Sequence, residues 1–181
     1  MKPQGLAYAV SLRVCNADYL LLWQDGGDMP DKYCVQPGAM QFLLARTSTE
    51  LLRKATKFEL KIADQEPVVM DLDKAFRVLA ALRPNKTSSE RSCQILLDAW
   101  NTLEDMARSL NISLEGKIED MELLHVAYDK LFYGNNLSPV TPVNENYNPL
   151  FSSEERRVMR SYFRQMWCEI LERTGQFSSE H

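Results

Sequence analysis

Short hydrophobic runs separated by turn residues occupy the first 45 positions of the chain. Runs rich in Tyr, Val and Leu alternate with polar breaks, the longest of which is Asp25-Gly-Gly-Asp-Met-Pro-Asp31. This alternation is typical of β-strands joined by turns. Pro37-Gly38 suits a type II turn, because proline fixes a negative φ and glycine accepts a positive one. The pattern predicts strands at 6–14, 18–24, 32–36 and 40–45.

Capping boxes mark the start of three predicted helices. In this motif a Ser or Thr hydroxyl and a Glu three residues later satisfy backbone N–H groups that have no partner within the helix. Each box precedes apolar residues at spacings of three and four, which place them on one helical face. The boxes are Thr47 with Glu50, Thr87 with Glu90, and Ser152 with Glu155.

Two further helices and one strand complete the pattern. Val68-Val69-Met70 lacks alternation, which predicts a buried strand, and Asp71 can cap a helix that ends before Arg83-Pro84. Helical spacing also predicts a helix at 117–133, followed by a long loop. Strands come first and helices afterwards, an order that favours an α+β fold over an alternating parallel sheet. We therefore expect a small N-terminal antiparallel sheet of three to five strands packed against a C-terminal bundle of helices.

Length and composition bound the class of protein. A chain of 181 residues, 45% of them hydrophobic, can bury a sufficient core as a single domain, residues 1–181, with 1–70 mainly strands plus one helix and 71–175 mainly helical. The four cysteines are far apart and form no C-x-x-C pair, which favours reduced thiols. The N-terminus lacks the apolar region of a secretory signal, and the longest apolar runs are far shorter than the ~20 residues that cross a bilayer. These features predict a cytoplasmic protein without a membrane partner.

Charge is modest overall but uneven along the chain. The 21 Lys and Arg against 25 Asp and Glu give a formal net charge of −4, and residues 71–135 alone carry eight basic and eleven acidic side chains. An acidic surplus repels nucleic acid and favours a basic protein partner. The chain also lacks a basic stripe with interleaved aromatics, so we predict no nucleic-acid partner.

Two acidic segments are candidates for contact with a basic partner. One is the 25–31 loop, which contributes Asp25 and Asp28, and the other is the start of the 117–133 helix, which contributes Glu119, Asp120 and Glu122. Carboxylates at the rim of an interface steer the encounter of two proteins. The alternative is structural, because a solvated loop and acids in the first turn of a helix need no partner.

Aromatic residues fall into two groups. Spacing assigns Trp100, Tyr162, Phe163 and Trp167 to the core, whereas Trp23, Tyr133 and Tyr147 are candidate partner anchors.

Catalytic motifs are missing from the sequence. It contains no G-x-S-x-G, no H-E-x-x-H and no glycine-rich phosphate loop. Glu122, His125 and Asp129 share one predicted helical face, which allows a metal or proton-transfer site, although a solvated polar face has the same pattern. We predict neither an enzyme nor a bound cofactor or metal.

Four segments carry a resemblance to a known family. The order of these segments resembles small bacterial immunity proteins, especially those of contact-dependent growth-inhibition systems. The resemblance implies a cytoplasmic protein that neutralises one cognate toxin, often a nuclease, by occluding its active site. The segments are QPGAMQFLLARTSTELLRKATKF, PVVMDLDKAFRVL, LLDAWNTLEDMARSL and YDKLFYGNNLSPVTP.

Two alternatives to an immunity protein stay open. The first is a small metal-dependent enzyme or regulator that uses Glu122, His125 and Asp129. The second is a structural adaptor that binds several proteins.

Overall fold

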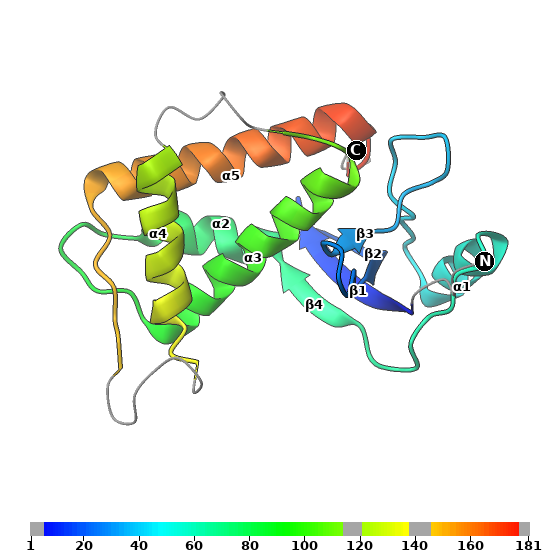
Figure 1. Cartoon of the computed structure of the whole chain (residues 1–181), viewed down its shortest axis with the longest axis horizontal. Coiled ribbons are helices and arrows are strands. Elements are labelled where there is room, and N and C mark those ends of the chain that lie inside the picture. Colours follow the sequence, from blue (N-terminus) through cyan, green and yellow to red (C-terminus); the bar gives the residue numbers. More distant parts are fainter. Residues whose placement is uncertain (1–5, 114–120, 138–145, 178–181) are drawn as a thin grey trace. The chain divides into compact units, whose positions relative to one another are not determined.

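The computed structural model describes residues 6–113, 121–137 and 146–177 and has an α+β fold. The residues form two compact units. Unit 1 comprises Met1–Asp73, Leu103–Ser113 and Cys168–His181, and unit 2 comprises Lys74–Thr102 and Leu114–Trp167. The prediction of a single domain stays a prediction. Figure 1 labels the helices and strands.

A four-stranded mixed sheet forms the centre of unit 1. Its strands are β1 (Ala7–Val14), β2 (Ala17–Gln24), β3 (Lys32–Tyr33) and β4 (Val68–Asp71), in the order β3-β2-β1-β4. The pairs β1–β2 and β2–β3 are antiparallel, as predicted, but β4 runs parallel to β1. The expectation of an all-antiparallel sheet is therefore wrong at this edge, because the chain returns to the sheet only after α1 (Ser48–Lys57) and an extended connection.

The two-residue turn between β1 and β2 is held by a side chain that lies far away along the sequence. Cys15 and Asn16 have φ angles of 53° and 58°, the left-handed region that such hairpin turns require. Their backbone N–H groups donate to the two carboxylate oxygens of Asp73, at 2.9 and 2.8 Å. Asp73 lies near the start of α2 (Leu72–Ala81), directly after β4. Because α2 follows β4 directly, the pairing of β4 with β1 places the Asp73 carboxylate beside the turn.

Helix α1 contributes to the core of unit 1 on one face of the sheet. Its capping box is present: the Glu50 N–H donates to the Thr47 hydroxyl (3.2 Å), and the Glu50 carboxylate accepts from the Arg46 N–H (3.0 Å). The helix buries Leu51 and Ala55. The small and aliphatic residues of this core are Ala7, Ala9, Leu22, Cys34, Leu43, Ala45, Leu51 and Ala55.

Two strand predictions are wrong. Residues 40–45 form no strand, only isolated bridges that join Phe42 to Val35 and Ala45 to Leu20. β4 is an edge strand rather than a buried one, since Val68 is 53% and Val69 73% exposed. Absence of alternation indicated two buried faces, but a strand at the edge of a sheet can leave apolar side chains in solvent. At Pro37-Gly38 the predicted turn is present, with Gly38 at φ 76°.

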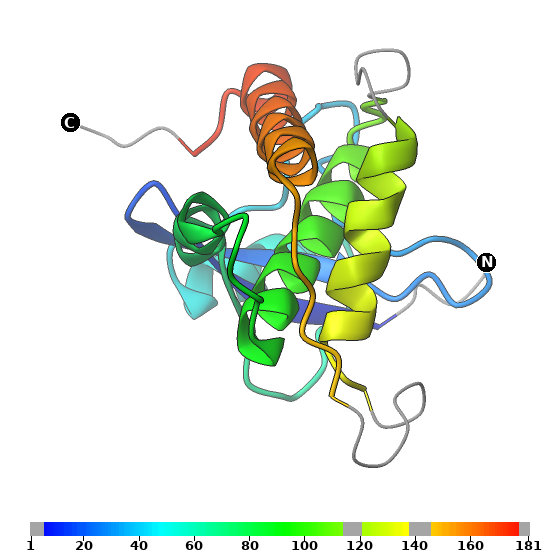
Figure 2. The same cartoon turned by 90° about the vertical axis from the view of Figure 1, so that its left-hand side faces the viewer.

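Four helices contribute to unit 2. They are α2, α3 (Glu90–Ser109), α4 (Met121–Gly134) and α5 (Ser153–Thr174), and the ends of α3 and α5 fall in unit 1. Figure 2 shows α4 alongside α3, where the Tyr128 hydroxyl donates to the Asn101 side chain at 3.3 Å. The predicted box at Thr87 is wrong, because Ser89 supplies the hydroxyl that accepts from the Ser92 N–H (3.3 Å).

Aromatic side chains fill the core of unit 2, as their spacing predicted. Trp100 and Phe163 are buried, and their ring centroids lie 5.8 Å apart. Tyr162 packs on Trp100 at 4.7 Å, and Trp167 is also buried. All four cysteines are free thiols.

No helix among the described residues is both long and apolar enough to cross a membrane.

Candidate functional site

The acidic loop between β2 and β3, residues 25–31, is held by its own hydrogen bonds. The Gly27 N–H donates to Asp25 Oδ1 (2.7 Å) and the Gly26 N–H to Asp31 Oδ1 (3.0 Å). The Met29 N–H donates to the Gly26 carbonyl at 2.9 Å. Asp and Gly are favoured in such loops because the carboxylate binds nearby backbone donors. The loop therefore has a defined conformation before any partner binds.

The last turns of α3 support this loop from outside. Arg108 Nη1 donates to the Asp31 carbonyl (3.1 Å) and forms an ion pair with Asp105 at 2.6 Å. The Trp23 indole N–H donates to Asp105 (3.1 Å) at the base of the loop. Trp23 is half-buried, and its indole N–H is engaged by Asp105. Of the three candidate aromatic anchors, only Tyr133 and Tyr147 are exposed.

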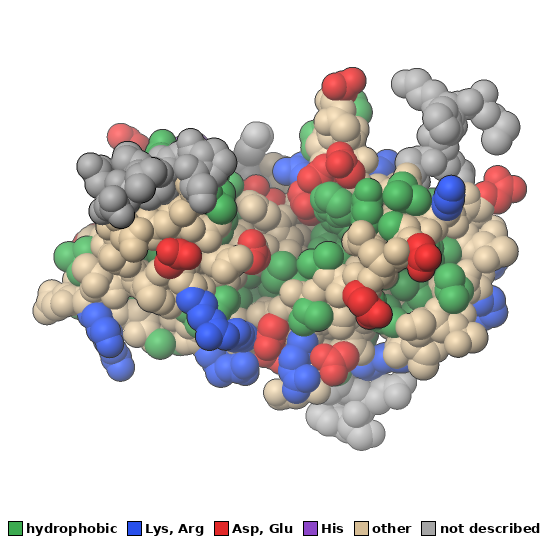
Figure 3. All heavy atoms as spheres, turned by 90° about the horizontal axis from the view of Figure 1, so that it is seen from below, with side chains coloured by type: hydrophobic (Ala, Val, Ile, Leu, Met, Phe, Trp, Pro, Cys, Tyr) green, Lys and Arg blue, Asp and Glu red, His purple; other side chains and the backbone are tan. Residues whose placement is uncertain are grey.

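Asp25, Asp28, Met29 and Pro30 are the exposed side chains of the acidic loop. Met29 is 72% exposed, and both carboxylates are exposed as well. Figure 2 shows the loop, drawn blue, extending from the sheet at the right of the view. Figure 3 shows acidic side chains on a projection at the upper centre, whereas over the rest of that face they lie singly or in small groups. The loop thus presents an apolar side chain beside two carboxylates.

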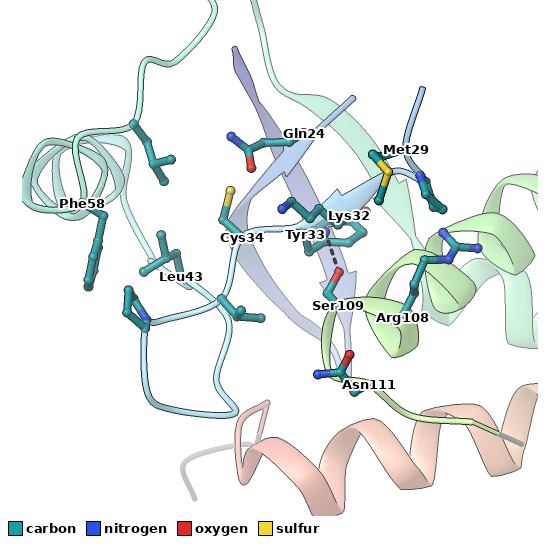
Figure 4. Close-up of a pocket in the computed structure, with 14 residues that line it drawn as sticks. Gln24, Met29, Lys32, Tyr33, Cys34, Leu43, Phe58, Arg108, Ser109 and Asn111 are labelled. Atoms are coloured by element: carbon teal, nitrogen blue, oxygen red, sulfur yellow. Dashed lines mark hydrogen bonds between the residues drawn. The ribbon is translucent and has the colours of Figure 1, made fainter. Parts of the chain in front are cut away.

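A cavity of about 590 Å³ lies beside the loop, within unit 1. Figure 4 shows Lys32, Tyr33 and Cys34 at its centre, with Met29 and Arg108 on one side and Leu43 and Phe58 on the other. The Tyr33 N–H donates to the Ser109 hydroxyl at 2.7 Å, which joins β3 to the end of α3. The lining of the cavity combines apolar walls with polar groups, a composition typical of binding sites.

The thiol in this cavity is not a nucleophile at neutral pH. Burial raises the pKa of Cys34 to about 11, although the charge of nearby Lys32 acts in the opposite direction. A thiol attacks as its thiolate, and at pH 7 almost all of Cys34 is protonated. Cys34 therefore supplies almost no thiolate to the cavity at neutral pH.

The predicted acidic residues belong to two different segments of the chain. Asp25 and Asp28 share the acidic loop, whereas Glu122 is exposed in the first turn of α4 in unit 2. Glu119 and Asp120 lie outside the described residues. The structure brings Asp25 and Asp28 together in one loop, and the partner-binding role of all five residues stays a prediction.

The alternative metal site receives no support from geometry. Glu122, His125 and Asp129 are all exposed on α4. Within residues 6–113, 121–137 and 146–177, no three or more His, Cys, Asp and Glu side chains are grouped so that they could hold a metal ion.

Sequence reasoning missed the support that α3 gives to the acidic loop. Asp105 and Arg108 lie more than 70 residues from the groups they contact in Trp23 and Asp31. No motif or spacing links residues so far apart along the chain.

Gly26 provides the first test of the loop conformation. A Cβ at this position would lie 1.9 Å from the Met29 carbonyl oxygen, so we expect Gly26→Ala to distort the loop while the sheet stays folded. Gly27→Asn is the matched control, because a Cβ at Gly27 has nothing within 4 Å and Asn tolerates its positive φ. Backbone NMR shifts should change at residues 25–31 for Gly26→Ala and only next to the substitution for Gly27→Asn. Equal, local changes in both variants would show that the close approach does not matter.

Asp105 provides a test based on pH. Burial raises the pKa of Asp105 above its ordinary value, and the hydrogen bonds from Trp23 and Arg108 only partly oppose this. The folded carboxyl therefore keeps its proton at a pH at which the unfolded one has lost it, and its contribution to stability falls as pH rises above about 4. We expect the unfolding free energy of the wild type, relative to Asp105→Asn, to fall between pH 4 and pH 7 in urea titrations. Asp64→Asn is the control for the loss of one exposed carboxylate. A rise in the unfolding free energy of the wild type relative to Asp105→Asn between pH 4 and pH 7 would contradict the expected direction.

Comparisons with known proteins add little to this geometry. No family model matches the chain, and no curated protein matches its sequence. Among solved structures, the C-terminal domain of SatS, determined in complex with bromine, is similar with a TM-score of 0.47 and 11% sequence identity. The match covers 93% of this chain and 92% of that domain. A likeness this distant contributes nothing to the interpretation of the site.

Proposed function

We propose that this chain is an immunity protein that binds a cognate bacterial toxin through the acidic loop and the adjacent cavity. One observation carries the proposal: two exposed carboxylates, Asp25 and Asp28, stand beside the 72% exposed Met29 on a loop held by internal hydrogen bonds. The resemblance of the sequence to immunity proteins points to the same class of function. Neutralisation is steric and electrostatic, without a chemical step.

The order in the acidic loop supports a protein partner. A preformed loop loses little conformational entropy on binding, so more of the contact energy appears as affinity. Met29 supplies an apolar, unbranched side chain that can adapt to an irregular surface. Asp25 and Asp28 at the rim increase the rate of encounter with a positively charged surface. The loop thus combines an apolar anchor with charged groups that favour one kind of partner.

The chemistry of the acidic loop favours a basic toxin domain, such as a nuclease. A nuclease holds phosphates with Lys and Arg side chains, and carboxylates compete for those side chains. Binding of the loop at such a site excludes the nucleic-acid substrate by charge and by volume. This function places the protein in the cytoplasm, where a delivered nuclease finds its substrate.

The product of the open reading frame immediately upstream is the partner to test. We expect co-expression of the chain to rescue cells from that protein, and the two purified proteins to form a complex measurable by calorimetry. Asp28→Lys is expected to weaken binding about tenfold or more, because it places a positive charge against basic partner residues. Asp64→Lys makes the same charge change elsewhere on unit 1 and is expected to alter affinity less than about threefold.

Two outcomes would contradict the proposal. Absence of both rescue and complex formation excludes this toxin as the partner and removes the basis for an immunity function. A complex whose affinity is equally insensitive to Asp28→Lys and Asp64→Lys places the interface away from the acidic loop.

A further inference from the structure

A second cavity, of about 550 Å³, lies between α2 and α5 within unit 2. Its volume falls in the range of small-molecule sites. Among the described residues that line it, the only charged side chains are two arginines, Arg160 and Arg164. The lining residues are Phe76, Leu79, Ala80, Arg160, Ser161, Arg164 and Trp167.

Arg160 is oriented by the end of helix α2. Its Nε and Nη2 donate to the Leu79 carbonyl at 3.4 and 3.3 Å, and Nη2 also donates to the Ala80 carbonyl at 3.0 Å. These carbonyls belong to the last turn of α2, where no intrahelical donor reaches them. The hydrogen bonds hold the guanidinium in place at the cavity and leave Nη1 out of the contacts with α2.

Arg164 lies one helical turn further along α5 on the same side. It is exposed and has no hydrogen-bond or ion-pair partner among the described residues. Two guanidinium groups at this spacing, i and i+4, lie next to each other on a helix surface. Like charges side by side repel, so an anion between them would be stabilised by both.

The walls of the cavity are apolar. Leu79 and Trp167 are buried, and the half-buried Phe76 packs against Phe163 with ring centroids 6.1 Å apart. This packing fixes the ring of Phe76, which lines the cavity. The combination requires a ligand with an anionic group for the arginines and an apolar body for the walls.

We propose that the α2–α5 cavity binds a small organic carboxylate with an aromatic or aliphatic body. A guanidinium presents donors in a planar fork that matches the two oxygens of a carboxylate. An anionic group between Arg160 and Arg164 would be attracted by both positive charges, and the apolar walls favour an organic body over an inorganic anion. This site is independent of the acidic loop and of the proposed toxin.

The test uses 1-naphthoate as the probe and 1-naphthalenemethanol, its neutral counterpart, as the control. We expect calorimetry and ligand-observed NMR on the full chain to show saturable binding of the naphthoate, with at least tenfold weaker binding of the alcohol. Arg164→Gln should reduce naphthoate affinity about tenfold, and Arg164→Lys should restore part of it, because lysine keeps the charge but loses the fork. Arg91→Gln removes an exposed arginine of the same unit outside the cavity and should leave affinity unchanged.

Three results of this experiment would contradict the proposed site. The proposal is wrong if naphthoate does not saturate, if the alcohol binds as tightly, or if Arg164→Gln and Arg91→Gln have equal effects. Because Arg164 makes no described hydrogen bond or ion pair, its substitution leaves the fold intact, and circular dichroism of the variant checks this directly.

Discussion

Replacing Glu155 with alanine is expected to lower the free energy of unfolding by about 3 kcal/mol. Glu155 is 4% exposed, and its carboxylate accepts from Lys130 Nζ at 2.7 and 2.9 Å and from the Ser152 N–H at 2.7 Å. Removal leaves a half-buried ammonium group and a helix-start N–H without this acceptor. Urea titration of the full chain, followed by far-ultraviolet circular dichroism, measures the loss.

The neighbouring Glu154 offers a matched control. It is exposed in the same helical turn, so Glu154→Ala is expected to change stability by less than about 0.5 kcal/mol. Replacing both members of the pair, Lys130→Met with Glu155→Leu, should recover most of the loss, since no unpaired charge then remains. If Glu155→Ala costs no more than Glu154→Ala, the buried pair does not stabilise this fold.

Replacing Phe163 with alanine is expected to cost about 4 kcal/mol, because it opens a cavity in the aromatic core of unit 2. Phe163 is 1% exposed, and its ring lies 5.8 Å from that of Trp100 and 6.1 Å from that of Phe76, between centroids. The side chains that surround the ring lose their contacts with it. Thermal and urea unfolding should both show the decrease.

Tyr133→Ala controls for removal of an aromatic side chain from the same unit. Tyr133 is 52% exposed at the end of α4, and we expect its loss to cost less than about 1 kcal/mol. A Phe163→Ala variant within 1 kcal/mol of Tyr133→Ala would show that the core relaxes around the missing ring.

Sequence patterns predicted well the elements that depend on local contacts. The β1–β2 hairpin, the helix capped by Thr47 and the helix capped by Ser152 each follow from residues a few positions apart. Hydrophobic spacing likewise identified the buried face that carries Trp100 and Phe163. In each of these cases the residues that stabilise the element lie within the same segment or recur along it at helical spacing.

The two wrong strand predictions share a dependence on distant neighbours. The segment 40–45 is apolar because Phe42 and Leu43 are core residues, but it meets the sheet only through isolated bridges. Val68 and Val69 have strand propensity, yet their exposure is decided by the strand order, which places β4 at an edge. Propensity does not specify which strand becomes the edge.

The candidate site was predictable in part. Asp and Gly in the acidic loop indicated a hairpin connection with exposed carboxylates, which is how Asp25 and Asp28 were identified. The exposure of Met29 and the support from Arg108 were not predictable, because both depend on where the end of α3 packs. The α2–α5 cavity likewise joins arginines and aromatic rings that no sequence motif connects.

The contact between Asp73 and the β1–β2 turn has a consequence for the order of folding. The hairpin closes through two residues, whereas the carboxylate lies 58 positions from Cys15 along the chain. Closing the longer loop costs more conformational entropy, and contacts distant in sequence form more slowly. We therefore expect the hairpin to form first as a local structure, and β4 and α2 to stabilise its turn when they pack later. The Asp73 carboxylate thus connects the local hairpin to the elements that we expect to pack against it later.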